Sequence, residues 1–242
     1  MAHAYFNPDQ TALFGEMVAR KDTTFEVEYY GLHGLASPVR TILAACGAAF
    51  TSVVPEDWAS AKAKSPFGVF PILTETAPDG KKIHIAETDA IVRYLGRKYG
   101  LLGRNVFEET VINTFASSNN HLLQRELAKW FTTKDPEARA VLKEKLFNES
   151  IKHWLEFHEK YLRDNGSNGH YVGSTMSIAD VLTVNLINIV VGIYGGDVVT
   201  EAKTPALWKV KTTLEAIPSY AAWTQTESFK AISARNKEVL GF

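Results

Sequence analysis

The strongest constraint on the fold is a change of sequence pattern at about residue 105. Before that point, short alternating runs rich in β-branched and aromatic residues are interspersed with segments of helical periodicity. They predict strands at 24–30, 50–54, 72–75 and 82–85 and helices at 37–47 and 87–99. The order is therefore β-α-β followed by β-β-α, which predicts a small α/β domain.

After residue 105 the strand patterns disappear, and apolar residues recur at helical spacing. Helices are predicted at 105–132 and 136–163, then from Ser177, and two more lie on either side of Ile217-Pro218. The side chains predicted to be buried include Trp130, Phe147, Trp154, Leu155, Phe157 and Tyr161. The second part of the chain is thus predicted to be all-α.

Residues at the ends of the predicted helices support these boundaries. Ser37 and Pro38 are typical of a cap and a first helical position, and Gly100 is typical of a helix end. Ser177 and Asp180 have the spacing of a capping box. The apolar segment that follows them predicts a helix buried in the middle of its domain.

Charge and composition argue against several classes of function. The 242 residues carry a net charge of -1 without a block of Lys and Arg, so we expect no nucleic-acid or membrane partner. Cys46 is the only cysteine, which excludes an intramolecular disulfide and fits a reducing compartment. The sequence has neither a signal-peptide pattern nor an apolar run of ~18 residues, so we expect a cytoplasmic protein.

Pro71 lies where a strand should begin. Proline has no backbone N–H, so a sheet accepts it only at an edge, at a strand start or at a bulge. Two explanations follow from the residues. Pro71 is a simple strand start after a loop, or the Phe70–Pro71 bond is cis and turns the backbone of Phe70 outward to face a ligand.

Three segments resemble the cytosolic glutathione transferases, in the family's order and spacing. Residues 29–40, YYGLHGLASPVR, are similar to the first strand, loop and helix that carry the catalytic Tyr of the tyrosine-type classes. Residues 57–73, DWASAKAKSPFGVFPIL, resemble a sigma-class run of Trp, Lys, Pro-Phe-Gly and a cis-proline. Residues 87–101, ETDAIVRYLGRKYGL, resemble the acidic or amide residue and the hydroxyl residue that begin a helix in this family.

The resemblance covers about residues 24 to 235 and implies a domain organisation. It implies a thioredoxin-like N-terminal domain at 24–102 and an all-helical glutathione-transferase C-terminal domain at 105–242, with an N-terminal extension at 1–23. It also implies a homodimer in which the N-terminal domain of one subunit meets the helical domain of the other. Trp130 and Phe131 are the candidate apolar contacts of that dimer.

The resemblance further implies which residues bind the charged ends of glutathione, an anionic tripeptide with a central thiol. Thr88 and the first N–H groups of its helix would hold the γ-glutamyl carboxylate, and Glu87 would hold the neighbouring ammonium. Lys62 and the indole N–H of Trp58 would bind the glycyl carboxylate.

The thiol lies at the centre of the implied chemistry. The backbone of Phe70, shaped by Pro71, would pair with the cysteinyl part of glutathione as a short strand would. Tyr29 would donate a hydrogen bond to the sulfur and favour the thiolate that attacks an electrophile. Tyr30 is the adjacent candidate, but strand alternation predicts that it points to the opposite face, in a core role.

Leu35 departs from the sigma-class pattern, in which an Arg usually follows the loop glycine. A cation close to the catalytic phenol lowers the pKa of the phenol and strengthens it as a donor, so the departure bears on how strongly the thiol is activated. Val69 likewise stands where that class sometimes has Lys.

The resulting prediction is a sigma-like, tyrosine-type glutathione transferase that joins glutathione to a hydrophobic electrophile, in detoxification or secondary metabolism. Glutathione is the co-substrate, and no metal is predicted. His33 and Leu35 are the predicted loop contacts of the electrophile. Two alternatives stay open: a glutathione-dependent isomerase, and a glutathione-binding protein of this fold with weak or no catalysis.

Other chemistries have less support in the sequence. Cys46 lies late in the first predicted helix, where a buried structural thiol is the better interpretation. His153 and His158 are five residues apart, which does not suit one face of a helix, and no metal-binding motif accompanies them.

Overall fold

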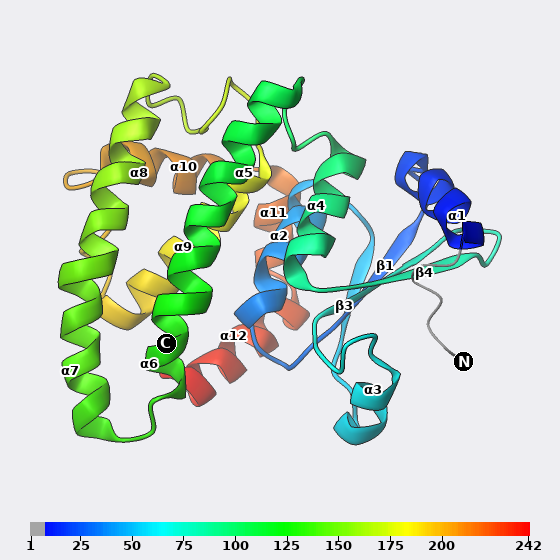
Figure 1. The fold of residues 1–242 in the computed structure, drawn as a ribbon, viewed down its shortest axis with the longest axis horizontal. Coiled ribbons are helices and arrows are strands. Elements are labelled where there is room, and N and C mark those ends of the chain that lie inside the picture. Colours follow the sequence, from blue (N-terminus) through cyan, green and yellow to red (C-terminus); the bar gives the residue numbers. More distant parts are fainter. Residues whose placement is uncertain (1–7) are drawn as a thin grey trace. The chain divides into compact units, whose positions relative to one another are not determined.

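The computed structural model describes residues 8–242 (Figure 1). These residues pack as two compact units. The first contains the described residues up to Leu101 together with Ala216–Phe242, and the second is Leu102–Glu215. The chain therefore returns to the first unit after it has built the second.

A four-stranded mixed sheet is the centre of the first unit. Its strands are β1 (Thr24–Glu28), β2 (Phe50–Val53), β3 (Ile72–Thr76) and β4 (Lys82–Ala86), in the order β2-β1-β3-β4. β1 pairs parallel to β2, with Phe25 opposite Phe50, and antiparallel to β3, with Val27 opposite Leu73. β3 and β4 form the predicted hairpin, which turns at Gly80. This arrangement confirms the predicted thioredoxin-like order.

Helices complete the first unit. They are α1 (Pro8–Ala19), α2 (Ser37–Ala45), α3 (Trp58–Lys64), α4 (Thr88–Tyr99), α11 (Pro218–Thr224) and α12 (Glu227–Leu240). α2 packs against α4, and α11 packs against α2, as Figure 1 shows. Val27, Ile42, Leu43, Leu73 and Leu95 are fully buried in the resulting core. The burial of such apolar side chains is the main stabilising contribution to a unit of this size.

The start of α2 differs by one residue from the prediction. A short 3₁₀ turn, η1 (Gly34–Ala36), runs directly into α2, so Ala36 is the cap, Ser37 the first helical residue and Pro38 the second. The end of α4 is as predicted, because Gly100 adopts the left-handed conformation with φ 72°.

The part of the N-terminal extension that the structure describes packs as part of the first unit. α1 contacts α4 and β4. The side chain of Lys98 in α4 is fully buried, and its Nζ donates to the carbonyls of Met17, at 2.6 Å, and Arg20, at 2.5 Å. The same Nζ lies 2.7 Å from a carboxylate oxygen of Glu75 in β3. Lys98 thus binds carbonyls in the last turn of α1 and just after it, and links them to the sheet.

The second unit consists of helices throughout its described length. They are α5 (Val106–His121), η2 (Leu122–Leu127), α6 (Ala128–Thr132), α7 (Pro136–Leu146), η3 (Phe147–Ile151), α8 (Lys152–Asp164), α9 (Ile178–Tyr194) and α10 (Pro205–Glu215). η2 and η3 are π-helical segments that join α5 to α6 and α7 to α8, so each long predicted helix is continuous. α9 is buried along most of its length, and its capping box forms as predicted, with the N–H of Ser177 donating to Asp180 at 2.7 Å.

Some predictions of burial in the helical segments are wrong. Phe157 and Tyr161 are 44% and 45% exposed, because the inward face of α8 carries Trp154, Leu155 and His158 instead. Trp130 is buried as predicted, but it lies beneath the guanidinium of Arg139, 3.8 Å from its ring centre. Its predicted role, together with Phe131, as an apolar contact of a dimer stays a prediction.

The tail contains three helices rather than the predicted two. α10 and α11 are separated at Ile217-Pro218 as expected, but a further break precedes α12. Thr226 causes that break by capping α12, since its Oγ1 accepts the N–H of Phe229 at 3.2 Å. None of the helices within residues 8–242 has the length and apolar character that crossing a membrane requires.

Candidate functional site

Tyr29 lies directly after β1, at the carboxyl end of the strand. Its N–H donates to the carbonyl of Val53 at 3.0 Å and so extends the parallel ladder by one residue. Its hydroxyl accepts the N–H of Leu35 at 3.2 Å. Gly34 makes this approach possible, because it has φ 39° and a Cβ there would lie 2.7 Å from the Tyr29 hydroxyl.

The surroundings of Tyr29 determine its protonation state. The side chain is 8% exposed, and burial raises the pKa of the phenol above its ordinary value of 10.0. The hydrogen bond from Leu35 acts in the opposite direction. The phenol therefore keeps its proton at neutral pH, and since its oxygen already accepts an N–H, its own O–H is oriented to donate.

Arg40 of α2 is a functional candidate that the sequence interpretation missed. It is fully buried, and its guanidinium carbon lies 5.9 Å from the ring centre of Tyr29. Its Nη1 donates to the carbonyl of Leu32 at 2.7 Å and so holds the loop that precedes η1. A charged residue in the otherwise uncharged helix SPVRTILAA was the signal in the sequence.

Thr88 and Glu87 begin α4, as the predicted carboxylate site requires. The Oγ1 of Thr88 donates to the carbonyl of Leu35 at 3.2 Å, so the backbone of Leu35 bonds Tyr29 through its N–H and Thr88 through its C=O. Glu87 is exposed and adopts φ 69°. Such a conformation is rare for a residue with a side chain and is found disproportionately at functional sites.

An aromatic group brings together two of the predicted glutathione contacts. The ring of Trp58 stacks on that of Tyr30 at 4.2 Å and meets the ring of Phe70 edge-on at 5.1 Å. Tyr30 is 47% exposed, so its predicted core role is wrong. β1 ends at Glu28, so strand alternation no longer determines the direction of the side chain at position 30.

The loop between α3 and β3 holds Phe70 and Pro71 in place. The Oγ of Ser65 donates to the carbonyl of Val69 at 2.6 Å and accepts its N–H at 3.0 Å. The Phe70–Pro71 bond is cis, as the second explanation considered from the sequence requires, and a ligand at the backbone of Phe70 stays a prediction. Lys62 is exposed on α3, and its side chain passes next to this loop, with Cε 3.6 Å from the position of a Cβ at Gly68.

His33 lies in the loop but is held by α12, which the sequence interpretation did not connect with the site. Its Nε2 lies 2.9 Å from the Oγ of Ser233, its N–H donates to Asn236 at 3.4 Å, and its ring lies 5.1 Å from that of Phe229. Burial lowers the pKa of His33 to about 4, so the imidazole is neutral at physiological pH. No local sequence pattern predicted this long-range contact.

Comparisons with known proteins establish the family and the fold. A family model described as "Glutathione S-transferase, C-terminal domain" matches residues 121–227. "Probable glutathione S-transferase 7" of Caenorhabditis elegans is 31% identical over 163 residues, which are 65% of this chain and 76% of the relative. The chain belongs to the glutathione S-transferase family. The resemblance found in the sequence is therefore confirmed, as is the prediction of a glutathione transferase or isomerase at the level of the family.

Two prostaglandin synthases match this glutathione S-transferase along most of their length. "Hematopoietic prostaglandin D synthase" of Gallus gallus is 28% identical over 218 residues, covering 86% of this chain and 98% of the relative. The structure of prostaglandin synthase D of Nilaparvata lugens superposes with a TM-score of 0.71 at 26% identity, covering 84% of this chain and 98% of that chain.

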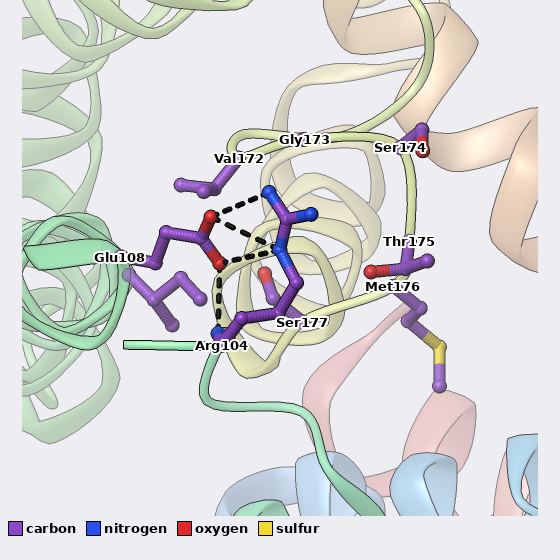
Figure 2. Close-up of a pocket in the computed structure, with 10 residues that line it drawn as sticks. Arg104, Glu108, Val172, Gly173, Ser174, Thr175, Met176 and Ser177 are labelled. Atoms are coloured by element: carbon purple, nitrogen blue, oxygen red, sulfur yellow. Dashed lines mark hydrogen bonds and ion pairs between the residues drawn. The ribbon is translucent and has the colours of Figure 1, made fainter. Parts of the chain in front are cut away.

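A hollow in the second unit involves none of the predicted site residues of this glutathione S-transferase (Figure 2). Its volume is about 100 Å³, smaller than the roughly 300–1,000 Å³ of a typical small-molecule pocket. The guanidinium of Arg104 folds onto the carboxylate of Glu108, with Nη2 to Oε1 at 2.7 Å, as Figure 2 shows. Because Glu108 neutralises this charge, the hollow offers a ligand little electrostatic attraction.

The other chemistries considered from the sequence gain no support. Burial raises the pKa of the Cys46 thiol to about 11, so it stays protonated and unreactive at neutral pH. His158 is 2% exposed and is bonded to Tyr171 and Ser118, whereas His153 is exposed on the same helix. The two histidines therefore do not form one site.

Proposed function

We propose that this member of the family is a sigma-like, tyrosine-type enzyme that conjugates the thiolate of glutathione to a hydrophobic electrophile. The observation that carries the proposal is the buried Tyr29 hydroxyl, oriented by the N–H of Leu35 and kept protonated by its surroundings. A positioned donor of this kind stabilises a bound thiolate. The free thiol has a pKa of ~8.5, so without help it is mostly protonated at neutral pH.

In this proposal the first unit binds glutathione through groups spread along its length. The γ-glutamyl carboxylate accepts hydrogen bonds from the hydroxyl of Thr88 and from the free N–H groups at the start of α4. The hydroxyl now donates to Leu35, so binding requires it to exchange that acceptor for the carboxylate. The carboxylate of Glu87 binds the ammonium of the γ-glutamyl group. Lys62 and the indole N–H of Trp58 bind the glycyl carboxylate.

The reactive step depends on the protonation states of the glutathione thiol and of the Tyr29 phenol. The sulfur loses its proton to solvent and accepts the O–H of Tyr29, and the thiolate then attacks the electrophilic carbon. In a substitution, a carbon–sulfur bond forms as the bond to the leaving group breaks. In an addition to an enone, the displaced electron pair takes a proton from water. Tyr29 stabilises the negative sulfur until the new bond consumes the charge.

A glutathione-dependent isomerase is the second candidate, because two matching proteins are named prostaglandin D synthases. In such a reaction the sulfur adds and leaves again, so glutathione is not consumed. Turnover of the purified protein with aromatic halides, enones, epoxides and isomerisable peroxides tests both candidates. Stoichiometric loss of glutathione supports conjugation, product without loss supports isomerisation, and glutathione binding without product supports a non-catalytic protein.

The homodimer and the cytoplasmic location remain part of this proposal. Sedimentation at micromolar concentration tests the dimer, and a protein that sediments only as a monomer contradicts it. Electrophile contacts at His33 and Leu35 are likewise proposed, with the difference that His33 is held by α12 and presents a neutral ring.

A further inference from the structure

The guanidinium of Arg40 is an unusual group for the interior of a protein. The residue has no exposed surface, yet Nε and Nη2 have no hydrogen-bond partner in the described part of the chain. Its one hydrogen bond there goes from Nη1 to the neutral carbonyl of Leu32. An unpaired buried charge is strongly unfavourable, so proteins retain one where a negative charge forms or binds nearby.

The neighbour of this cation is the Tyr29 ring, 5.9 Å from the guanidinium carbon. Among residues 8–242, Arg40 and Tyr30 are the charged or titratable groups that act on the phenol, and they act in opposite directions. Burial lowers the pKa of Arg40, but a guanidinium keeps its proton in proteins, so Arg40 remains a cation. His33, in the loop before η1, is neutral, and the side chain of Leu35 is apolar.

We propose that Arg40 is the positioning residue of the catalytic centre, holding the Tyr29 loop by its bond to Leu32 and supplying from α2 the positive charge that favours the bound thiolate. This inference rests on the proposed function and deepens it, because it explains how a loop without a cationic side chain can activate a thiol. The charge acts through Tyr29: it makes the phenol a stronger donor to sulfur.

Arg40→Gln tests the proposal, since glutamine keeps a donor for Leu32 and removes the charge. We expect the apparent pKa of the thiol in the glutathione complex, followed by thiolate absorbance, to rise by about one unit, with turnover at neutral pH about tenfold lower. Leu35→Arg added to Arg40→Gln should restore at least half of that shift. Arg104→Gln makes the same change at an exposed arginine of the second unit, and it should leave the thiol pKa and the turnover unchanged.

A purely structural role for Arg40 predicts a different result. It would lower the melting temperature and the turnover together and would leave the thiolate titration curve where it is. A folded Arg40→Gln protein with an unchanged titration curve therefore overturns the proposal.

A titration of the free protein does not depend on glutathione. It therefore tests the coupling of Arg40 to Tyr29 separately from the proposed function. The phenol of Tyr29 can be titrated in the free protein as the absorbance difference between the parent and Tyr29→Phe. Arg40→Gln should move that titration to higher pH. If the parent binds no glutathione but this shift is seen, the proposed function fails while the coupling of Arg40 to Tyr29 stands.

The unsubstituted protein provides a test if Arg40→Gln does not fold. The guanidinium ¹⁵N resonances of Arg40, assigned with Arg40→Lys, should move with the midpoint of the Tyr29 titration. Resonances that do not change through that titration overturn the proposal.

Discussion

The backbone N–H of Leu35 donates a hydrogen bond to the hydroxyl of Tyr29 over 3.2 Å. The interaction explains why a leucine is compatible with a site of this kind, since the contribution comes from the main chain and not from the side chain. It also aligns the phenol, because an oxygen that accepts from one direction presents its proton in another.

Gly34→Ala should displace the Tyr29 hydroxyl. The new Cβ would lie 2.7 Å from that oxygen and 3.0 Å from the ring, so the ring must move. We expect turnover to fall at least tenfold, with a loss of stability of about 1–2 kcal/mol from the left-handed backbone. The control variant is Gly80→Ala, because Gly80 also has a positive φ, 84°, but a Cβ there would meet open space. Equal turnover in the two variants would show that the Gly34 contact does not position Tyr29.

Lys62→Ala should weaken glutathione binding without affecting the fold. A charge-assisted contact contributes ~1.5–3 kcal/mol, so calorimetry should show affinity reduced roughly tenfold or more. Lys64→Ala removes another exposed lysine of the same helix and should bind as the parent does. The same loss in both variants would indicate a general charge effect instead of a site at Lys62.

Thr88→Ala should also reduce affinity, and Thr88→Ser should retain most of it, because serine keeps the hydroxyl that donates to Leu35 and is proposed to exchange to the carboxylate. Calorimetric titration of both variants with glutathione measures the difference. If serine and alanine bind equally, the hydroxyl has no role and only the N–H groups of α4 remain as candidates.

The sequence predicted the order of the elements and the main motifs because these depend on local signals. Alternation identified β1, glycine ended α4, and Ser177 with Asp180 began α9. Tyr29 and Thr88 were predicted from the family resemblance of the segments 29–40 and 87–101 that contain them. The packing of His33 against α12 was not predictable in the same way, because it joins residues 200 positions apart and depends on tertiary contacts alone.

The wrong predictions at Tyr30, Phe157 and Tyr161 arose because local sequence patterns do not determine tertiary contacts. Tyr30 was placed by strand alternation, but β1 ends two residues earlier. Phe157 and Tyr161 fit a helical repeat on α8, yet the face that is buried is set by the neighbouring helices and not by the repeat. Arg40 was visible as a charge in an apolar helix, but only the three-dimensional structure shows that it lies next to Tyr29.

Stability should decrease in acid because of His158. Burial lowers the pKa of His158 to about 3 from an ordinary value of 6.5, so the unfolded chain takes up the proton first as the pH falls. The free energy of unfolding should therefore fall between pH 6.5 and 3, at up to about 1.4 kcal/mol per pH unit. His158→Gln should flatten this dependence in urea titrations. His153→Gln, at an exposed position of α8, should leave the pH dependence of stability unchanged. If it flattens that dependence as well, His158 is not the group responsible.

Lys98→Met should destabilise the first unit strongly. The change leaves Glu75 as an uncompensated buried charge and removes the donor to the carbonyls of Met17 and Arg20. Breaking a buried pair in this way costs about 3–5 kcal/mol, which urea unfolding measures directly. Lys82→Met, at an exposed position of β4, should change stability by less than about 0.5 kcal/mol. A comparably small effect of Lys98→Met would mean that α1 is not anchored as described.

Tyr29→Phe tests the central claim most directly. The substitution keeps the ring and removes the donor, so folding and glutathione affinity should change little. Thiolate absorbance of the glutathione complex, followed against pH, should show the thiol pKa raised by about one unit or more, with turnover roughly ten- to a thousandfold lower at neutral pH. Coincident titration curves and equal turnover for the parent and Tyr29→Phe would contradict the account, and a large effect from Tyr30→Phe instead would assign the role to the neighbouring residue.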